Sequence, residues 1–125
     1  MRLFTVEEAN ALLPTVRQVV ARIQRGYARV AGSQEAARRA AECASLGGGG
    51  MEGGAGYVAA LTGLAESVGQ LEALGVQLKD YERGLIDFPA MREGRVVLLC
   101  WQMGEGESVE WWHDVEAGFA GRQPL

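Results

Sequence analysis

The stretch that decides the fold is residues 84–101, which read GLIDFPAMREGRVVLLCW. Two apolar runs in this stretch flank a turn at Arg92–Arg95, whose third residue is Gly94. Glycine at this place supplies the positive φ that a tight hairpin turn needs. We therefore predict an antiparallel β-hairpin in which Arg92 faces Arg95.

A second turn, at residues 104–107, leads to a third predicted strand at residues 108–113. Residues 76–78 are the candidate for a short fourth strand. Pairing Met103 with Ser108 across the second turn places Cys100 beside Trp111 and Leu99 beside Trp112. The expected result is a three- to four-stranded antiparallel sheet built as a meander.

Side chains alternate between the two faces of such a sheet. One face is apolar and is expected to pack on helices; it carries Ile86, Phe88, Val97, Leu99, Trp101 and Trp112. The other face is part polar and part aromatic; it carries Asp87, Leu98, Cys100, Trp111 and His113. The second face is the predicted recognition surface.

The N-terminal part of the chain has the pattern of an amphipathic helix. Thr5 and Glu8 form a capping box at its start. Apolar residues then recur every three or four positions, at Leu12, Val16, Val19, Ile23, Tyr27 and Val30. Pro14 removes one backbone hydrogen bond, so a kink is expected there.

A second helical stripe runs through Val58, Leu61, Leu64, Ala65, Val68, Leu71 and Leu74 and ends at Gly75, a typical C-cap. The two helices are expected to pack as an antiparallel hairpin. At about 1.5 Å per residue the first would span roughly 60 Å and the second about 27 Å. Either the first helix breaks near Gly32, or a second copy of the chain covers its overhang. We favour a homodimer of coiled-coil type.

These elements define one predicted α+β domain over residues 1–125: a long antiparallel helical hairpin packed on the small sheet. The predicted boundaries are helix one at 1–46, a glycine-rich connection at 47–56, helix two at 57–75, and the meander with the C-terminal tail at 76–125.

The 125-residue chain has a formal net charge of −4, which argues against a nucleic-acid partner. Arginines make the first helical region locally basic: Arg17, Arg22, Arg25, Arg29, Arg38 and Arg39. No apolar run reaches the roughly 18–20 residues of a membrane span. Cys43 and Cys100 are far apart, and residues 1–5 lack an apolar export segment, so a cytoplasmic protein with reduced thiols is expected.

Metal-ligand residue types occur at Asp87, Cys100, His113 and Asp114. In the projected register, the Cα atoms of Asp87 and His113 lie roughly 11–12 Å apart, which argues against a shared ion. Cys100 lies in mid-strand among apolar residues, where a thiol is usually inert. We therefore predict no catalytic residue, no metal ligand and no cofactor.

The favoured function is a non-enzymatic, oligomerising binding or regulatory module with a protein or small-molecule partner. Its predicted binding residues are Asp80, Arg83, Asp87, Cys100, Trp111, His113 and Asp114. The alternative is a small enzyme or metal-binding protein with a site around Asp87, Cys100, His113 and Asp114. It requires His113 within about 3 Å of Cys100 or a carboxylate.

Segments spread over nearly the whole chain carry a family resemblance. They read FTVEEANALLP (4–14), LGVQLKD (74–80), RGLIDFPA (83–90), LCW (99–101), WHD (112–114) and GFAGR (118–122). The chain resembles the small prokaryotic family catalogued as domain of unknown function 2203. The resemblance implies a stand-alone cytoplasmic domain whose two ends belong to one unit, and it brings no activity, cofactor or catalytic residue to this sequence.

Overall fold

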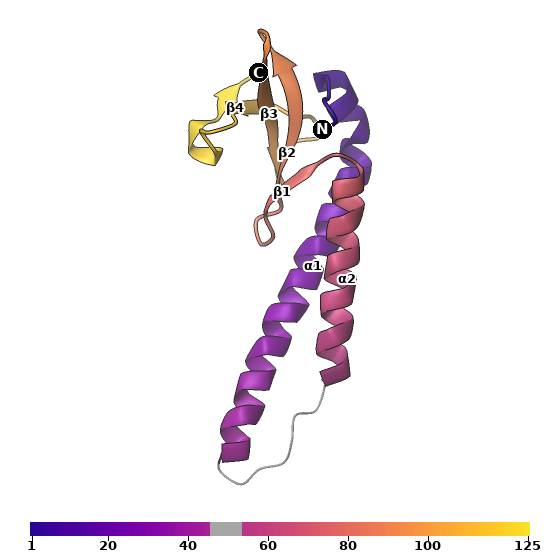
Figure 1. The fold of residues 1–125 in the computed structure, drawn as a ribbon, viewed down its shortest axis with the longest axis vertical. Coiled ribbons are helices and arrows are strands. Elements are labelled where there is room, and N and C mark those ends of the chain that lie inside the picture. Colours follow the sequence, from indigo (N-terminus) through magenta and orange to yellow (C-terminus); the bar gives the residue numbers. More distant parts are fainter. Residues whose placement is uncertain (46–53) are drawn as a thin grey trace.

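The computed structural model describes residues 1–45 and 54–125. Two helices form a hairpin that projects from a small antiparallel sheet (Figure 1). The elements are α1 (Val6–Ser45), α2 (Gly54–Ala73), β1 (Gln77–Asp80), β2 (Leu85–Arg92), β3 (Arg95–Gln102), β4 (Trp111–Asp114), the 3₁₀ helix η1 (Phe119–Gly121) and β5 (Gln123–Pro124). The strands pair in the order β1-β2-β3-β4-β5, so the predicted α+β meander is confirmed.

The capping box at the start of α1 forms as the sequence predicts. The Thr5 N–H donates to Oε1 of Glu8 at 2.9 Å, and the Glu8 N–H donates to the Thr5 hydroxyl oxygen at 3.0 Å. The Thr5 N–H also holds the pKa of Glu8 below its ordinary value, because it stabilises the carboxylate. From this cap, α1 runs without interruption through Pro14 and Gly32. The break near Gly32, one of the two explanations for the unequal helix lengths, is therefore wrong.

The N-terminal third of α1 is buried in one core with the sheet. Just before the helix, the Phe4 ring meets Phe88 edge-on at 5.2 Å, and its N–H donates to the Pro89 carbonyl. Asn10 Oδ1 accepts a hydrogen bond from the Val109 N–H at 2.7 Å. The unequal helix lengths therefore have an explanation inside one chain, because the sheet occupies this part of α1.

The second helix begins at Gly54, three residues before the predicted start, and the rest of the predicted connection, residues 47–53, lies outside the described residues. The φ of Gly75 is +86°, so it caps α2 as predicted. Leu71 is fully buried in the core. The start of the predicted apolar stripe behaves differently: Val58 is 61% exposed and Leu61 is 40% exposed.

The sheet has the projected register. Arg92 pairs with Arg95, Asp87 with Cys100, and Leu99 with Trp112. Positive φ values at Glu93 and Gly94 close the first turn. The two-residue strand β5, which pairs with β4, was not expected and adds a fifth strand to the three or four predicted.

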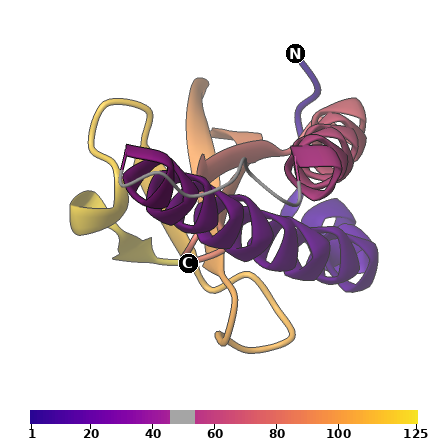
Figure 2. The ribbon, with the colours of Figure 1, turned by 90° about the horizontal axis from the view of Figure 1, so that it is seen from below.

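The apolar sheet face forms one core with the helices, and all six residues predicted for that face are buried in it. The view along the hairpin places the sheet end of α2 and the start of α1 on one side of the sheet, with the C-terminal segment on the other (Figure 2). Within residues 1–45 and 54–125, the helices are too short or too polar to cross a membrane.

Candidate functional site

Three polar side chains gather on the sheet face turned away from the helices. Asp87 comes from β2, Cys100 from β3 and His113 from β4, three neighbouring strands. The Cα partner of Asp87 is Cys100, and that of His113 is Leu98, two residues before Cys100. Strand alternation therefore places the three side chains on one face, as the sequence predicts, and we call them the sheet cluster.

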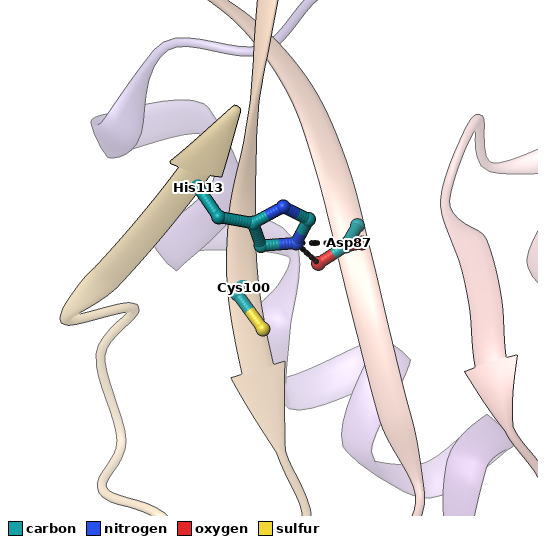
Figure 3. Close-up of side chains that lie close together, drawn as sticks. All are labelled: Asp87, Cys100 and His113. Carbon is teal, nitrogen blue, oxygen red and sulfur yellow. Dashed lines mark hydrogen bonds and ion pairs between the residues drawn. The ribbon is translucent and has the colours of Figure 1, made fainter. Parts of the chain in front are cut away.

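The expectation that Asp87 and His113 are too far apart to share a ligand is wrong. Nε2 of His113 lies 3.1 Å from each carboxylate oxygen of Asp87. The two side chains lean toward one another across β3, beside the Cys100 thiol (Figure 3). One ligand atom from each of the three residues lies within 4.8 Å of the others. The sequence estimate compared Cα positions and gave too little weight to the reach of an imidazole and a carboxylate directed at each other.

The orientation of the His113 ring follows from its other hydrogen bond. Nδ1 lies 2.8 Å from the backbone carbonyl oxygen of Asp114. A carbonyl oxygen can only accept, so Nδ1 carries a hydrogen and donates it. This leaves Nε2 as the atom that faces Asp87, and one proton between Nε2 and the carboxylate satisfies both groups.

The sheet cluster is shielded from solvent. Asp87 and Cys100 are each 1% exposed, and His113 is 3% exposed. Burial, followed by the negative charge of Asp87, raises the pKa of the Cys100 thiol to about 12, while the Arg122 guanidinium acts in the opposite direction. The Cys100 thiol is therefore protonated at neutral pH. The predicted recognition face therefore does not present Asp87, Cys100 and His113 to solvent, and their role as binding residues stays a prediction.

Arginine and aromatic side chains gather around the C-terminal part of this face. The Arg122 guanidinium lies 5.0 Å from the Trp111 ring centre and 4.7 Å from that of Phe119, and it donates to both carboxylate oxygens of Glu105 at 2.8 Å. Arg83 lies over Phe119 at 4.3 Å. We call these five residues the arginine–aromatic cap. Sequence reasoning included Arg83 and Trp111 and missed the other three, although Phe119 and Arg122 stand at helical spacing.

Two further predicted binding residues have local roles. Oδ1 of Asp80 accepts hydrogen bonds from the backbone N–H groups of Glu82 and Arg83, which forms the turn before β2. The Asp114 carboxylate pairs with Arg95 at 3.0 Å, near the end of the sheet. Neither carboxylate belongs to the sheet cluster.

The helical hairpin carries an exposed apolar groove of about 440 Å³. We call it the hairpin groove; it is lined by Tyr27, Val30, Leu61, Leu64, Ala65, Val68, Gly69, Glu72 and Tyr81. The rings of Tyr27 and Tyr81 stack at 5.7 Å, and both residues are partly open to solvent. Glu72 is the one charged residue in this lining, so the groove suits an apolar partner.

A separate groove of about 400 Å³ holds part of the basic stretch of α1. Arg22, Arg25 and Arg29 line it together with Glu66 of α2. Arg22 donates to Oε1 of Gln70 at 3.0 Å. The groove is thus of mixed charge, and the absence of a nucleic-acid partner stays a prediction.

Comparison with known proteins identifies a family for the chain. A family model described as uncharacterized conserved protein, DUF2203, matches residues 2–125. The resemblance stated from the sequence segments is therefore confirmed. The searches of curated proteins and of solved structures gave no match.

Proposed function

The chain belongs to this family of uncharacterized conserved proteins, and we propose that it is a non-enzymatic binding module that associates with a second copy of itself. The observation that carries the proposal is the hairpin groove, an apolar surface left open along α2. The exposed apolar side chain of Val58 continues it toward the start of the helix. Burying this surface against another chain would remove apolar area from water.

The pattern of residue sizes along α2 favours a second copy as the occupant. A large side chain at Leu61 is followed, one turn at a time, by small residues at Ala65 and Gly69. If two copies pack antiparallel about Ala65, Leu61 of each chain lies against Gly69 of the other. Such a surface is self-complementary, as a two-fold interface requires. Two hairpins joined in this way would form an antiparallel four-helix coiled coil.

The burial of the sheet cluster supports a non-enzymatic role. A catalytic carboxylate, thiol or imidazole has to reach its substrate, and Asp87, Cys100 and His113 are each at most 3% exposed. The cap residues are more accessible than the cluster: Phe119 is 37% exposed between Arg83 and Arg122. A further protein or small-molecule partner would meet this cap. The two free thiols are in keeping with the reducing cytoplasm as its compartment.

The proposal is tested by the oligomeric state of three proteins across a range of concentrations. Native mass spectrometry and light scattering should give a dimer for the unmodified chain and a monomer for Leu61→Arg. A matched control is Val115→Arg, because Val115 is 57% exposed and lies outside the hairpin groove. This variant should remain dimeric. Circular dichroism checks that all three are equally helical.

A monomeric unmodified chain at every concentration would contradict the proposal. So would a Leu61→Arg variant that dimerises as strongly as the unmodified chain, because the groove would then not be the contact surface.

A further inference from the structure

The sheet cluster brings together three of the side-chain types that bind transition metals. An imidazole nitrogen, a carboxylate oxygen and a thiol sulfur lie within 4.8 Å of one another (Figure 3). Donor atoms about 2.0–2.3 Å from a tetrahedral ion lie about 3.3–3.8 Å apart. The 3.1 Å separation of His113 and Asp87 is close to this value, and small side-chain shifts would bring the Cys100 sulfur, which lies within 4.8 Å, to the same spacing. The convergence comes from three adjacent strands whose register is fixed by ladder hydrogen bonds. The three donors are therefore held by a rigid scaffold and not by loops.

The His113 ring is already oriented as a metal ligand. Its Nδ1–H donates to the Asp114 carbonyl oxygen at 2.8 Å, which leaves the lone pair of Nε2 directed at Asp87 and able to bind a cation. Metal-bound histidines commonly use their second nitrogen in this way, since a carbonyl acceptor fixes both the tautomer and the direction of the ring. Nε2 and the carboxylate of Asp87 then face each other as two acceptors, so either a proton or a metal ion lies between them.

A proton between His113 and Asp87 satisfies that pair, and the Cys100 thiol makes a hydrogen bond with Asp87. A divalent ion uses all three donors. It also preserves the charge of the buried cluster: the ion replaces the thiol proton and the shared proton, so two positive charges leave and two enter. A binding reaction that leaves the net charge unchanged avoids the large cost of placing an uncompensated charge in the protein interior.

On these grounds we infer that Asp87, Cys100 and His113 bind one divalent transition-metal ion of borderline softness, with Zn²⁺ as the best fit. A donor set of nitrogen, sulfur and a single carboxylate disfavours Mg²⁺ and Ca²⁺, which take oxygen ligands. Among the described residues, the sheet cluster supplies three donor atoms to the ion, one each from Asp87, Cys100 and His113. A zinc ion that takes four ligands completes its shell with water. This site is independent of the proposed self-association, because the hairpin groove and the sheet cluster share no residue.

The probe for this site is Co²⁺, which occupies zinc sites and whose absorption reports its ligands. The ion is supplied both to the folded protein and during refolding, so that a closed site cannot exclude it. We expect one Co²⁺ per chain and a near-ultraviolet charge-transfer band from the Cys100 thiolate. Cys100→Ser should abolish the band and weaken binding by more than about tenfold. The matched control, Cys43→Ser, removes the exposed thiol of α1 and should leave both unchanged.

A second variant, Asp87→Asn, keeps the size of the side chain, removes its charge and should also weaken binding. Circular dichroism checks that each variant is folded. Failure of the folded, unmodified chain to bind Co²⁺ by either route would overturn the inference. A charge-transfer band that persists in Cys100→Ser and disappears in Cys43→Ser would overturn it as well, since the metal would then lie on the surface.

Discussion

Nε2 of His113 lies 3.1 Å from both carboxylate oxygens of Asp87, although β3 separates the strands that carry them. The contact therefore links β2 to β4 directly, across the strand with which both form their ladder hydrogen bonds. Both side chains are almost completely buried. Each side chain therefore needs the other as its hydrogen-bond partner, because water does not reach either of them.

Asp87→Ala should destabilise the metal-free protein by about 3 kcal/mol or more, because it leaves Nε2 of His113 buried without a partner. Urea unfolding with a chelator present measures the loss. Asp114→Ala is the control, since it removes an ion pair with Arg95 whose side chains are 44% and 57% exposed. That change should cost at most about 1 kcal/mol. Equal losses in the two variants would show that the His113–Asp87 contact adds no stability.

The buried thiol makes stability depend on pH in the alkaline range. The pKa of Cys100 is raised from 9.0 to about 12 in the folded protein. As the pH rises, the Cys100 thiol therefore loses its proton at a lower pH in the unfolded chain than in the folded one. The stability that the protonated thiol contributes is fully present below pH 9 and is lost as the pH rises from 9 toward 12. The difference in unfolding free energy between the unmodified chain and Cys100→Ala should narrow over that interval. A constant difference would contradict the raised pKa.

Alkylation should distinguish the two cysteines. At pH 8 and in the absence of denaturant, iodoacetamide should modify the exposed Cys43 and leave the buried Cys100 intact, because the thiolate is the reactive form. Peptide mass spectrometry locates the label. Addition of urea beyond the unfolding transition should make Cys100 react as well. Rapid labelling of Cys100 in the folded protein would mean that the sheet cluster opens to solvent.

The capping box makes the start of α1 sensitive to acid. The pKa of Glu8 is lowered on folding, so its contribution to stability is present above the ordinary pKa of a glutamate and is lost as the pH falls through the lowered value. Glu8→Gln can still accept the hydrogen bond from Thr5 but does not titrate, so it should remove this part of the pH dependence. Thr5→Ala should cost about 1 kcal/mol at neutral pH. Thermal unfolding followed by circular dichroism tests both.

Substitutions at two turn glycines distinguish the cost of backbone strain from the cost of steric crowding. Gly84 and Gly94 both have positive φ, +64° and +80°. A Cβ at Gly84 would lie 2.9 Å from Cβ of Met103 and from Cγ1 of Val20, whereas at Gly94 it would meet nothing within 4 Å. Gly94→Ala should cost about 1 kcal/mol from backbone strain, and Gly84→Ala about 3 kcal/mol once the overpacking is added. Urea unfolding gives both values, and similar losses would mean that Val20 and Met103 move aside.

The register of the sheet could be predicted because one short turn determines it. Once Arg92 faces Arg95, every later pair in β2 and β3 follows by counting, and the pairing of Asp87 with Cys100 is one of them. The capping box was equally predictable, since Thr5 and Glu8 interact within one helical turn. Interactions of this kind can be predicted because they involve only residues that are close together in the sequence.

Features that depend on distant parts of the chain were missed. The two residues of β5 are too few to show alternation, and they become a strand only because β4 offers them an edge. The meeting of His113 with Asp87 depends on the direction of two side chains, which strand spacing alone does not give. The exposure of Val58 and Leu61 depends on where α1 lies beside α2, and the apolar stripe of α2 carries no information about that placement.

The hydrogen bond between Asn10 and Val109 spans 99 positions of the chain. During synthesis, the first turns of α1 leave the ribosome long before the residues that cover them. Their apolar side, including Leu13 and Val16, has to wait for the sheet to be made. Contacts between such distant parts of a chain form late, and apolar surface exposed in the meantime favours aggregation. The nascent chain is therefore expected to need a chaperone until Val109 has emerged, although the finished domain is small.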